Sequence, residues 1–140
     1  MNAELPKLIV ALYLVGADLD PVTITGILKV QPSKTQKKGQ EFITASGREY
    51  KAKTGTWALI VELESEPLDV HLRRLIDALP KSTSLVGLPG AESAFIDVFV
   101  GVSSRPTGEG SCELSIPAEV VPELAALGLR VNFTFSAGPD

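Results

Sequence analysis

The unbroken apolar run from Leu8 to Val15 constrains the fold most, because a strand formed by these residues is apolar on both faces. The run is too short to cross a membrane as a helix, which takes about 20 residues. A strand that is apolar on both faces belongs in the middle of a covered sheet. Gly16 ends the run, so the sequence predicts a buried central strand over residues 7–15.

The same run has one feature of a secretion signal, since Val15-Gly16-Ala17 looks like a small-residue cleavage site. Glu4 and Pro6 do not suit a leader, and the run continues directly into a helix start. We therefore expect this segment to remain in the folded domain as a strand.

Helix starts and apolar periodicity predict short helices. Asp20 can cap free backbone N–H groups, and Pro21 suits the first position of a helix. Residues 67–79 carry one continuous apolar stripe, and Pro80 stops this second helix. Its stripe consists of Leu68, Leu72, Leu75, Ile76 and Leu79. A third short helix is expected between Pro117 and Leu127, with Gly128 as its C-terminal cap.

The remaining apolar segments predict strands. Residues 48–53 alternate like an outer or edge strand, and residues 57–63 are richer in apolar side chains and suit a more central one. The last strand should point Leu129, Val131, Phe133 and Phe135 inward. Other strands are expected at 95–102 and 111–116, with a further short one near 84–88, a hairpin loop at 104–110 and an exposed loop at 31–40.

These elements give the order β-α-β-β-α-β-β-α-β. The helices are short and tight turns join several strands, which favours an α+β two-layer sandwich. We expect a largely antiparallel twisted sheet with two or three helices on one face, forming one domain over residues 1–140. The first six elements match the split-βαβ pattern.

Chemistry-bearing residues are scarce. A single cysteine, Cys112, excludes an internal disulfide, and one histidine leaves too few ligands for structural zinc. Asp18 and Asp20 could contact a hard cation, but a turn and a helix cap account for them. His71 is expected at the flank of the apolar stripe, where it could serve as a general base beside an acid. Phosphate-loop and nucleophile-elbow motifs are missing, so we expect no catalytic, cofactor or metal site.

Charge is divided unevenly along the chain. The net charge is −4, yet Lys29 to Lys53 holds seven basic and two acidic residues, or +5, so the rest sums to −9. A solvated basic hairpin is one interpretation, and a charged partner surface is the other. Tyr50 could stack on a base, whereas Trp57 suits either the core or a ligand platform. The candidate binding surface comprises Lys34, Lys37, Lys38, Arg48, Tyr50, Lys51 and Lys53, together with His71.

The chain contains several short motifs whose order and spacing are typical of one protein family. They are Gly16-Ala17-Asp18-Leu19-Asp20-Pro21, Ile24, Ile27-Leu28, Pro32, Lys38-Gly39, Trp57, His71-Leu72, Leu75 and Leu124-Ala125-Ala126-Leu127-Gly128-Leu129. In this order the chain resembles the bacterial family known as domain of unknown function 4279, from about Leu8 to Phe133. The resemblance implies a small cytoplasmic bacterial α+β protein and implies no reaction, cofactor or catalytic residue.

Three functions remain open. The first is a non-catalytic binding module for a partner protein, in the specific case an immunity-type partner of a toxin. The second is a nucleic-acid or anionic-ligand binder acting through Lys34 to Lys53, and the third is a hydrolytic enzyme that uses His71. Of these we favour the first, as a monomer or homodimer with no membrane association.

Overall fold

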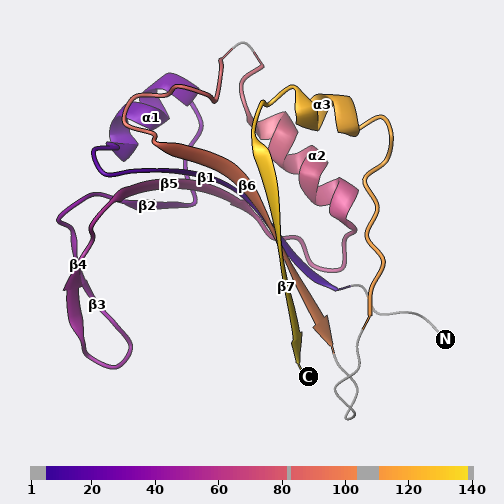
Figure 1. Cartoon of the computed structure of the whole chain (residues 1–140), viewed down its shortest axis with the longest axis horizontal. Helices are drawn as coiled ribbons and strands as arrows, with labels where there is room; N and C mark the ends of the chain where they lie inside the picture. The colour runs from indigo at the N-terminus through magenta and orange to yellow at the C-terminus, as the bar shows by residue number, and fades with distance from the viewer. Residues whose placement is uncertain (1–5, 82, 104–110, 139–140) are drawn as a thin grey trace.

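The computed structural model describes residues 6–81, 83–103 and 111–138 and has the expected α+β architecture (Figure 1). The elements are β1 (Lys7–Gly16), α1 (Pro21–Leu28), β2 (Lys34–Gln36), β3 (Glu41–Ile43), β4 (Glu49–Lys51), β5 (Gly55–Val61), α2 (Leu68–Ala78), β6 (Ser93–Ser103), α3 (Val121–Ala125) and β7 (Arg130–Gly138). Within the described residues, no helix is both long enough and apolar enough to span a bilayer.

The main sheet has five strands in the order β2-β5-β1-β6-β7. As expected, β1 is central, and it pairs antiparallel with both β5 and β6. β2 also pairs antiparallel with β5, whereas β6 and β7 are parallel. The sheet is therefore largely antiparallel, as predicted. The predicted split-βαβ pattern is also present, because β1-α1-β2 places two parallel strands on either side of β5, and β5-α2-β6 places two on either side of β1. Its second strand is β2 rather than the strand predicted at residues 48–53.

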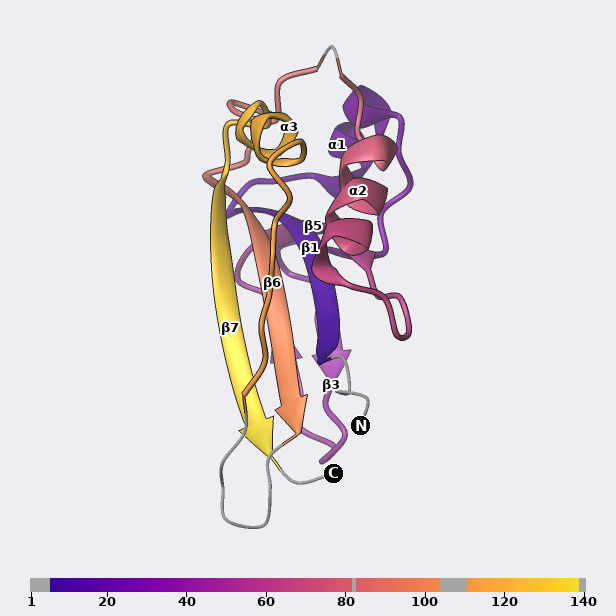
Figure 2. The same ribbon diagram turned by 90° about the vertical axis from the view of Figure 1, so that its right-hand side faces the viewer.

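The helices cover one face of this sheet and enclose the core (Figure 2). Asp20 caps α1 by accepting from the backbone N–H of Val22 at 3.2 Å, and Pro21 is the first helical residue. The apolar stripe predicted for α2 is buried, and it packs on the inner faces of β1 and β5. The inner face of β6 supplies Ile96, Val98 and Val100, which are also fully buried.

Two glycines let two connecting loops approach the sheet closely. Gly16 and Gly55 face each other at the ends of β1 and β5. A Cβ on Gly55 would lie 2.2 Å from the backbone oxygen of Leu19, and one on Gly16 would lie 1.8 Å from the backbone oxygen of Gly90. Neither distance is possible for a side chain, so the loop before α1 can pack at Gly55, and the loop before β6 at Gly16, only because both residues lack one.

The segment between α1 and α2 differs from the prediction. Residues 34–36, expected in an exposed loop, form the edge strand β2. This strand needs no apolar period, because backbone pairing with Thr56, Trp57 and Ala58 holds it to the sheet. β3 and β4 form a separate sheet of two strands, so four strands, rather than two, separate α1 from α2.

The prediction of a strand over 111–116 is wrong. The parallel strand β7 occupies the edge of β6 that this strand would need. Leu114 and Ile116 nevertheless pack against the core from an irregular segment. The described residues near 84–88 form no strand either, although Leu85 and Leu88 are buried. The hairpin loop expected at 104–110 lies outside the described residues.

The last strand also departs from the prediction. Val131 is partly buried, but Phe133 and Phe135, expected to point into the core, are 42% and 62% exposed. They stand beside Val98 and Val100 on the helix-facing side of the sheet. β7 is the outermost strand and extends beyond α3, so these rings are not covered by a helix (Figure 1).

Candidate binding surface

The basic residues of the candidate surface lie in two neighbouring regions, and all of them are exposed. Lys34, Lys37 and Lys38 belong to β2 and the turn that follows it. Arg48, Lys51 and Lys53 belong to the β3–β4 hairpin and its return to β5. The structure therefore brings the charges of residues 34–53 to one end of the molecule, where the hairpin projects from the main sheet (Figure 1).

A compact turn and a fixed base hold the hairpin. In the turn, the N–H of Thr44 donates to the oxygen of Arg48 at 2.9 Å, and Gly47 adopts φ +83°. At the base, the N–H of Ala52 donates to the oxygen of Gln40 at 2.9 Å, and the buried Ala52 anchors the return strand. β3 and β4 pack chiefly against each other, so the hairpin is tied to the domain only at its base.

The two faces of the hairpin expose apolar side chains. Phe42 lies opposite Tyr50, and their rings stack with centroids 5.2 Å apart. On the other face, Ile43 is 74% exposed beside Glu49. The side chains are thus ordered by the hairpin itself without being buried in the domain.

Exposed ion pairs do not cancel the positive charge of this region. Between Lys34 and Lys53 there are six basic residues and two acidic residues, so the net charge is 6 − 2 = +4. Lys51 lies 3.9 Å from Glu41, and both side chains are more than 70% exposed. Such a pair contributes little to stability and exchanges readily with a partner's charges.

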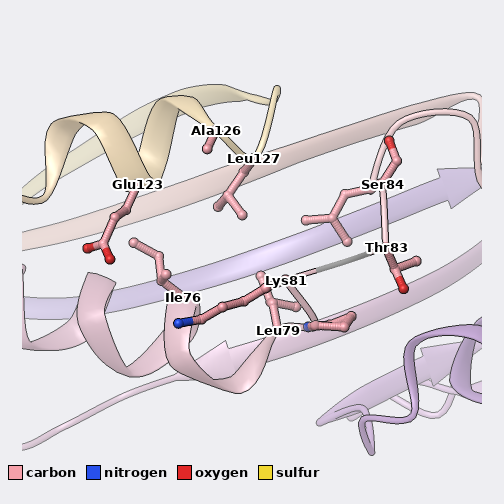
Figure 3. Close-up of a pocket in the computed structure, with 10 residues that line it drawn as sticks. Ile76, Leu79, Lys81, Thr83, Ser84, Glu123, Ala126 and Leu127 are labelled. Carbon is pink, nitrogen blue, oxygen red and sulfur yellow. The ribbon is translucent and has the colours of Figure 1, made fainter.

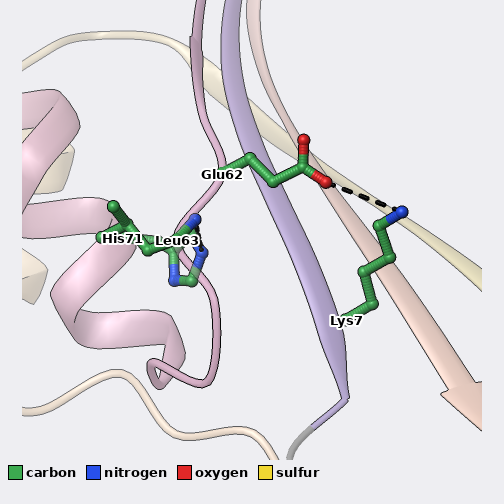
Figure 4. Close-up of polar contacts among 4 residues, drawn as sticks. All are labelled: Lys7, Glu62, Leu63 and His71. Atoms are coloured by element: carbon green, nitrogen blue, oxygen red, sulfur yellow. Dashed lines mark hydrogen bonds and ion pairs between the residues drawn. The ribbon is translucent and has the colours of Figure 1, made fainter.

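His71 is not part of this surface. The helical wheel placed it at the flank of the α2 stripe, but the structure buries it completely in the core. Its Nε2 accepts from the backbone N–H of Leu63 at 3.0 Å (Figure 4). Its Nδ1 lies 3.0 Å from the backbone oxygen of Pro67. Because Nε2 accepts, the ring proton belongs on Nδ1, which donates to Pro67.

This arrangement leaves the imidazole without catalytic capacity. The lone pair of Nε2 accepts from the backbone N–H of Leu63, and the proton of Nδ1 is donated to the backbone oxygen of Pro67. A general base must reach a substrate proton within hydrogen-bonding distance, and a fully buried ring cannot do so. His71 instead joins the segment after β5 to the first turn of α2.

Trp57 likewise belongs to the core rather than to a ligand platform. Its side chain is completely buried, and its indole N–H donates to the Oγ1 of Thr25 on α1 at 3.0 Å. A buried indole N–H requires such a partner. The sequence left Trp57 open between the core and a ligand platform, and nothing in it identified Thr25 as the acceptor.

A concavity lies between the end of α2 and α3 (Figure 3). Its volume is about 380 Å³, and the buried side chains Ile76 and Leu79 form part of its lining. Lys81 and Glu123 supply charge, and Glu123 is already engaged by Arg73. Its lining hydroxyl on Ser84 is bonded to the backbone of Val86, and the hollow could hold a small apolar group.

Candidate metal ligands do not converge in the described part of the chain. No group of three His, Cys, Asp or Glu side chains there could hold an ion. Asp20 is engaged as the α1 cap, bonding Val22 and the hydroxyl of Thr23. Cys112 is exposed and unpaired.

Sequence reasoning missed Phe42 and Ile43 as members of the surface. The signal was available, because a turn centred on Ser46-Gly47 places residue 42 opposite residue 50. Only the register shows that Tyr50 is paired with a second ring rather than standing alone.

Comparison with known proteins identifies a family and nothing more. No curated protein and no solved structure matches the chain. One family model matches residues 6–137, which is nearly the whole chain and includes every motif quoted for the resemblance. Its description is "Domain of unknown function (DUF4279)". The chain therefore belongs to the DUF4279 family.

Proposed function

We propose that this protein is a non-catalytic binding module that recognises a partner protein through the β3–β4 hairpin. The observation that carries the proposal is the exposure of apolar side chains on a projecting hairpin. Ile43 is 74% exposed and Tyr50 47% exposed, and neither is needed to complete the core. These side chains are grouped with Phe42 on one projecting hairpin, and a group of exposed apolar side chains marks an interaction site on soluble proteins.

The composition of the hairpin suits a protein interface. Aromatic residues and arginine are enriched at the centres of interfaces. Here Phe42 and Tyr50 lie on one face of the hairpin, and the exposed Arg48 directly precedes β4. The opposite face adds Ile43 between charged neighbours. With a local net charge of 6 − 2 = +4, the surface is complementary to a partner that presents an acidic rim around an apolar centre.

The specific form that we propose is an immunity-type role in the bacterial cytoplasm, in which the protein covers a toxin. Two features support this form: the chain is small, and its charge is divided between a basic hairpin and an acidic remainder. Such a division steers association with an oppositely charged surface and increases its rate.

Binding of nucleic acid or another polyanion is the second candidate. It is favoured by the exposure of six basic side chains near the stacked Phe42–Tyr50 pair. The two candidates differ in salt dependence, because each phosphate contact releases counterions. Titration of labelled single-stranded DNA and RNA across a salt series should show no association at low salt if a protein is the partner.

Affinity capture with matched variants tests the proposal. The wild-type protein and three variants, Ile43→Ser, Tyr50→Ser and Val22→Ser, are immobilised and exposed to lysate of the cells that produce the protein. Val22 is the control because it is 79% exposed on α1, away from the hairpin. Circular dichroism first establishes that all variants are folded.

We expect one protein to be retained by wild type and by Val22→Ser, and to be lost with Ile43→Ser and Tyr50→Ser. Retention of the same protein by both hairpin variants would contradict the proposal. So would the retention of nucleic acid as the only species that depends on the hairpin.

A further inference from the structure

The two edges of the main sheet are built differently. β2 has three residues, of which Lys34 is charged and exposed. Short length and lysine are the devices with which proteins protect an edge from pairing. β7 has nine residues, no lysine and no proline, and its only charged residue is Arg130 at the start. Among the described residues, no strand pairs with its outer side.

The unprotected edge also carries exposed aromatic rings. Phe133 and Phe135 stack on each other with centroids 6.2 Å apart, and both are exposed. A long, apolar open edge favours pairing with another chain. Since β7 lacks the features that protect β2, its sequence favours pairing with a further strand at this edge.

We propose that β7 pairs antiparallel with β7 of a second copy of this chain, about a twofold axis at Thr134. In that register Phe133 lies opposite Phe135 of the other copy, and Phe135 lies opposite its Phe133. The four rings then form one cluster on the helix-facing side, continuous with the rows of Val98 and Val100. Cross-strand aromatic pairs of this kind stabilise antiparallel strands.

The charges of β7 fit the same register. Arg130 lies opposite Gly138 of the second copy, and Asn132 lies opposite Ser136, so no like charges face each other across the axis. Arg130 is also held within its own copy, where its guanidinium lies 5.1 Å from the Phe95 ring centroid. A second copy is therefore a self-complementary occupant, as a twofold interface requires. This surface is separate from the β3–β4 hairpin.

Mass in solution gives the first test. Sedimentation velocity and light scattering across a concentration series should show wild type at twice its chain mass of 14.8 kDa. Phe135→Glu should reduce the species to a single chain, because it places two carboxylates inside the ring cluster. Val22→Glu, on exposed α1 surface, should leave the dimer intact. Circular dichroism checks that the variants are folded.

Disulfide trapping tests the register. In a Cys112→Ser background, Thr134→Cys brings two thiols together at the axis, where paired Cα atoms are about 4.5–5.5 Å apart and within disulfide reach. Ser136→Cys places its thiols roughly 13 Å apart along the strands, too far for a bond. We expect a covalent dimer from Thr134→Cys alone.

Wild type that remains a single chain at every concentration would overturn the proposal. A dimer that survives Phe135→Glu, or that gives no covalent product with Thr134→Cys, would overturn it as well, because the contact would then lie elsewhere.

Discussion

The backbone N–H of Leu63, just after β5, donates to the Nε2 of His71 on α2 across 3.0 Å. His71 also bonds the oxygen of Pro67 at the start of the same helix, so one buried ring fixes the connection between sheet and helix. A histidine that satisfies two backbone groups in the core is a structural residue. The only histidine of the chain is thereby committed to the fold.

Replacing His71 by alanine should lower the free energy of unfolding by about 2–5 kcal/mol. The Leu63 N–H loses its acceptor, which costs about 1–3 kcal/mol, and a cavity adds to the loss. Urea denaturation followed by circular dichroism measures the change. Arg74→Ala, on the exposed side of the same helix, should stay within about 0.5 kcal/mol of wild type. Equal effects of the two substitutions would contradict the structural role of His71.

The bond between Trp57 and Thr25 should appear as a coupling in a double-mutant cycle. We expect Trp57→Phe and Thr25→Val to be each destabilising and their effects to be non-additive by about 1 kcal/mol, because the hydroxyl at residue 25 serves the indole N–H. Denaturation is followed by circular dichroism, since Trp57 is the only tryptophan. Strict additivity would show that the bond contributes nothing.

Two glycine-to-alanine substitutions should have effects of opposite sign. Gly55→Ala forces a Cβ to within 2.2 Å of the Leu19 oxygen and should cost about 3 kcal/mol or more, since backbone atoms must move. Gly26→Ala, on α1 with no atom within 4 Å of the new Cβ, should gain about 0.5–1 kcal/mol from helix propensity. Thermal denaturation distinguishes them, and a tolerated Gly55→Ala would refute the close approach.

The hairpin residues should contribute to binding much more than to stability. Ile43→Ser should change the free energy of unfolding by less than about 0.5 kcal/mol, because its side chain is exposed and outside the core. Tyr50→Ser also loses the stack with Phe42 and should cost no more than about 1 kcal/mol. Chemical denaturation measures this. A loss of several kcal/mol would mean that these side chains serve the fold, and it would remove the main argument for a binding surface.

Elements with strong local signals were predicted correctly from sequence. The apolar run at Leu8 to Val15 gave the central strand β1, Asp20-Pro21 gave the start of α1, and the stripe of residues 67–79 gave α2. Each depends on periodicity or capping, which a single segment carries by itself.

Elements decided by pairing could not be predicted in this way. β2 has no apolar pattern, because it is held by backbone bonds to β5. Leu114 and Ile116 alternate with polar residues as in a strand, but β7 pairs with the edge of β6 that such a strand would need. Phe133 and Phe135 fit an inward pattern but lie where helix cover ends.

For the candidate surface too, the features carried by composition were predicted correctly, and those that depend on packing or strand register were not. The exposed cations of residues 34–53 were recognisable from composition, and the structure places them in two neighbouring exposed regions, at β2 and at the β3–β4 hairpin. The position of His71 was wrong, because a helical wheel gives the direction of a residue but not the depth of the elements packed against it. The pairing of Phe42 with Tyr50 required the hairpin register.

Site-specific photo-crosslinking tests the central claim, recognition of a partner protein through the hairpin, most directly. A photoreactive phenylalanine analogue replaces Tyr50 or, as a control, Val22 in the cells that produce the protein, and adducts are identified after irradiation. We predict a light-dependent adduct with one protein from position 50 and none from position 22. The absence of any protein adduct at position 50, or identical adducts from both positions, would contradict the account.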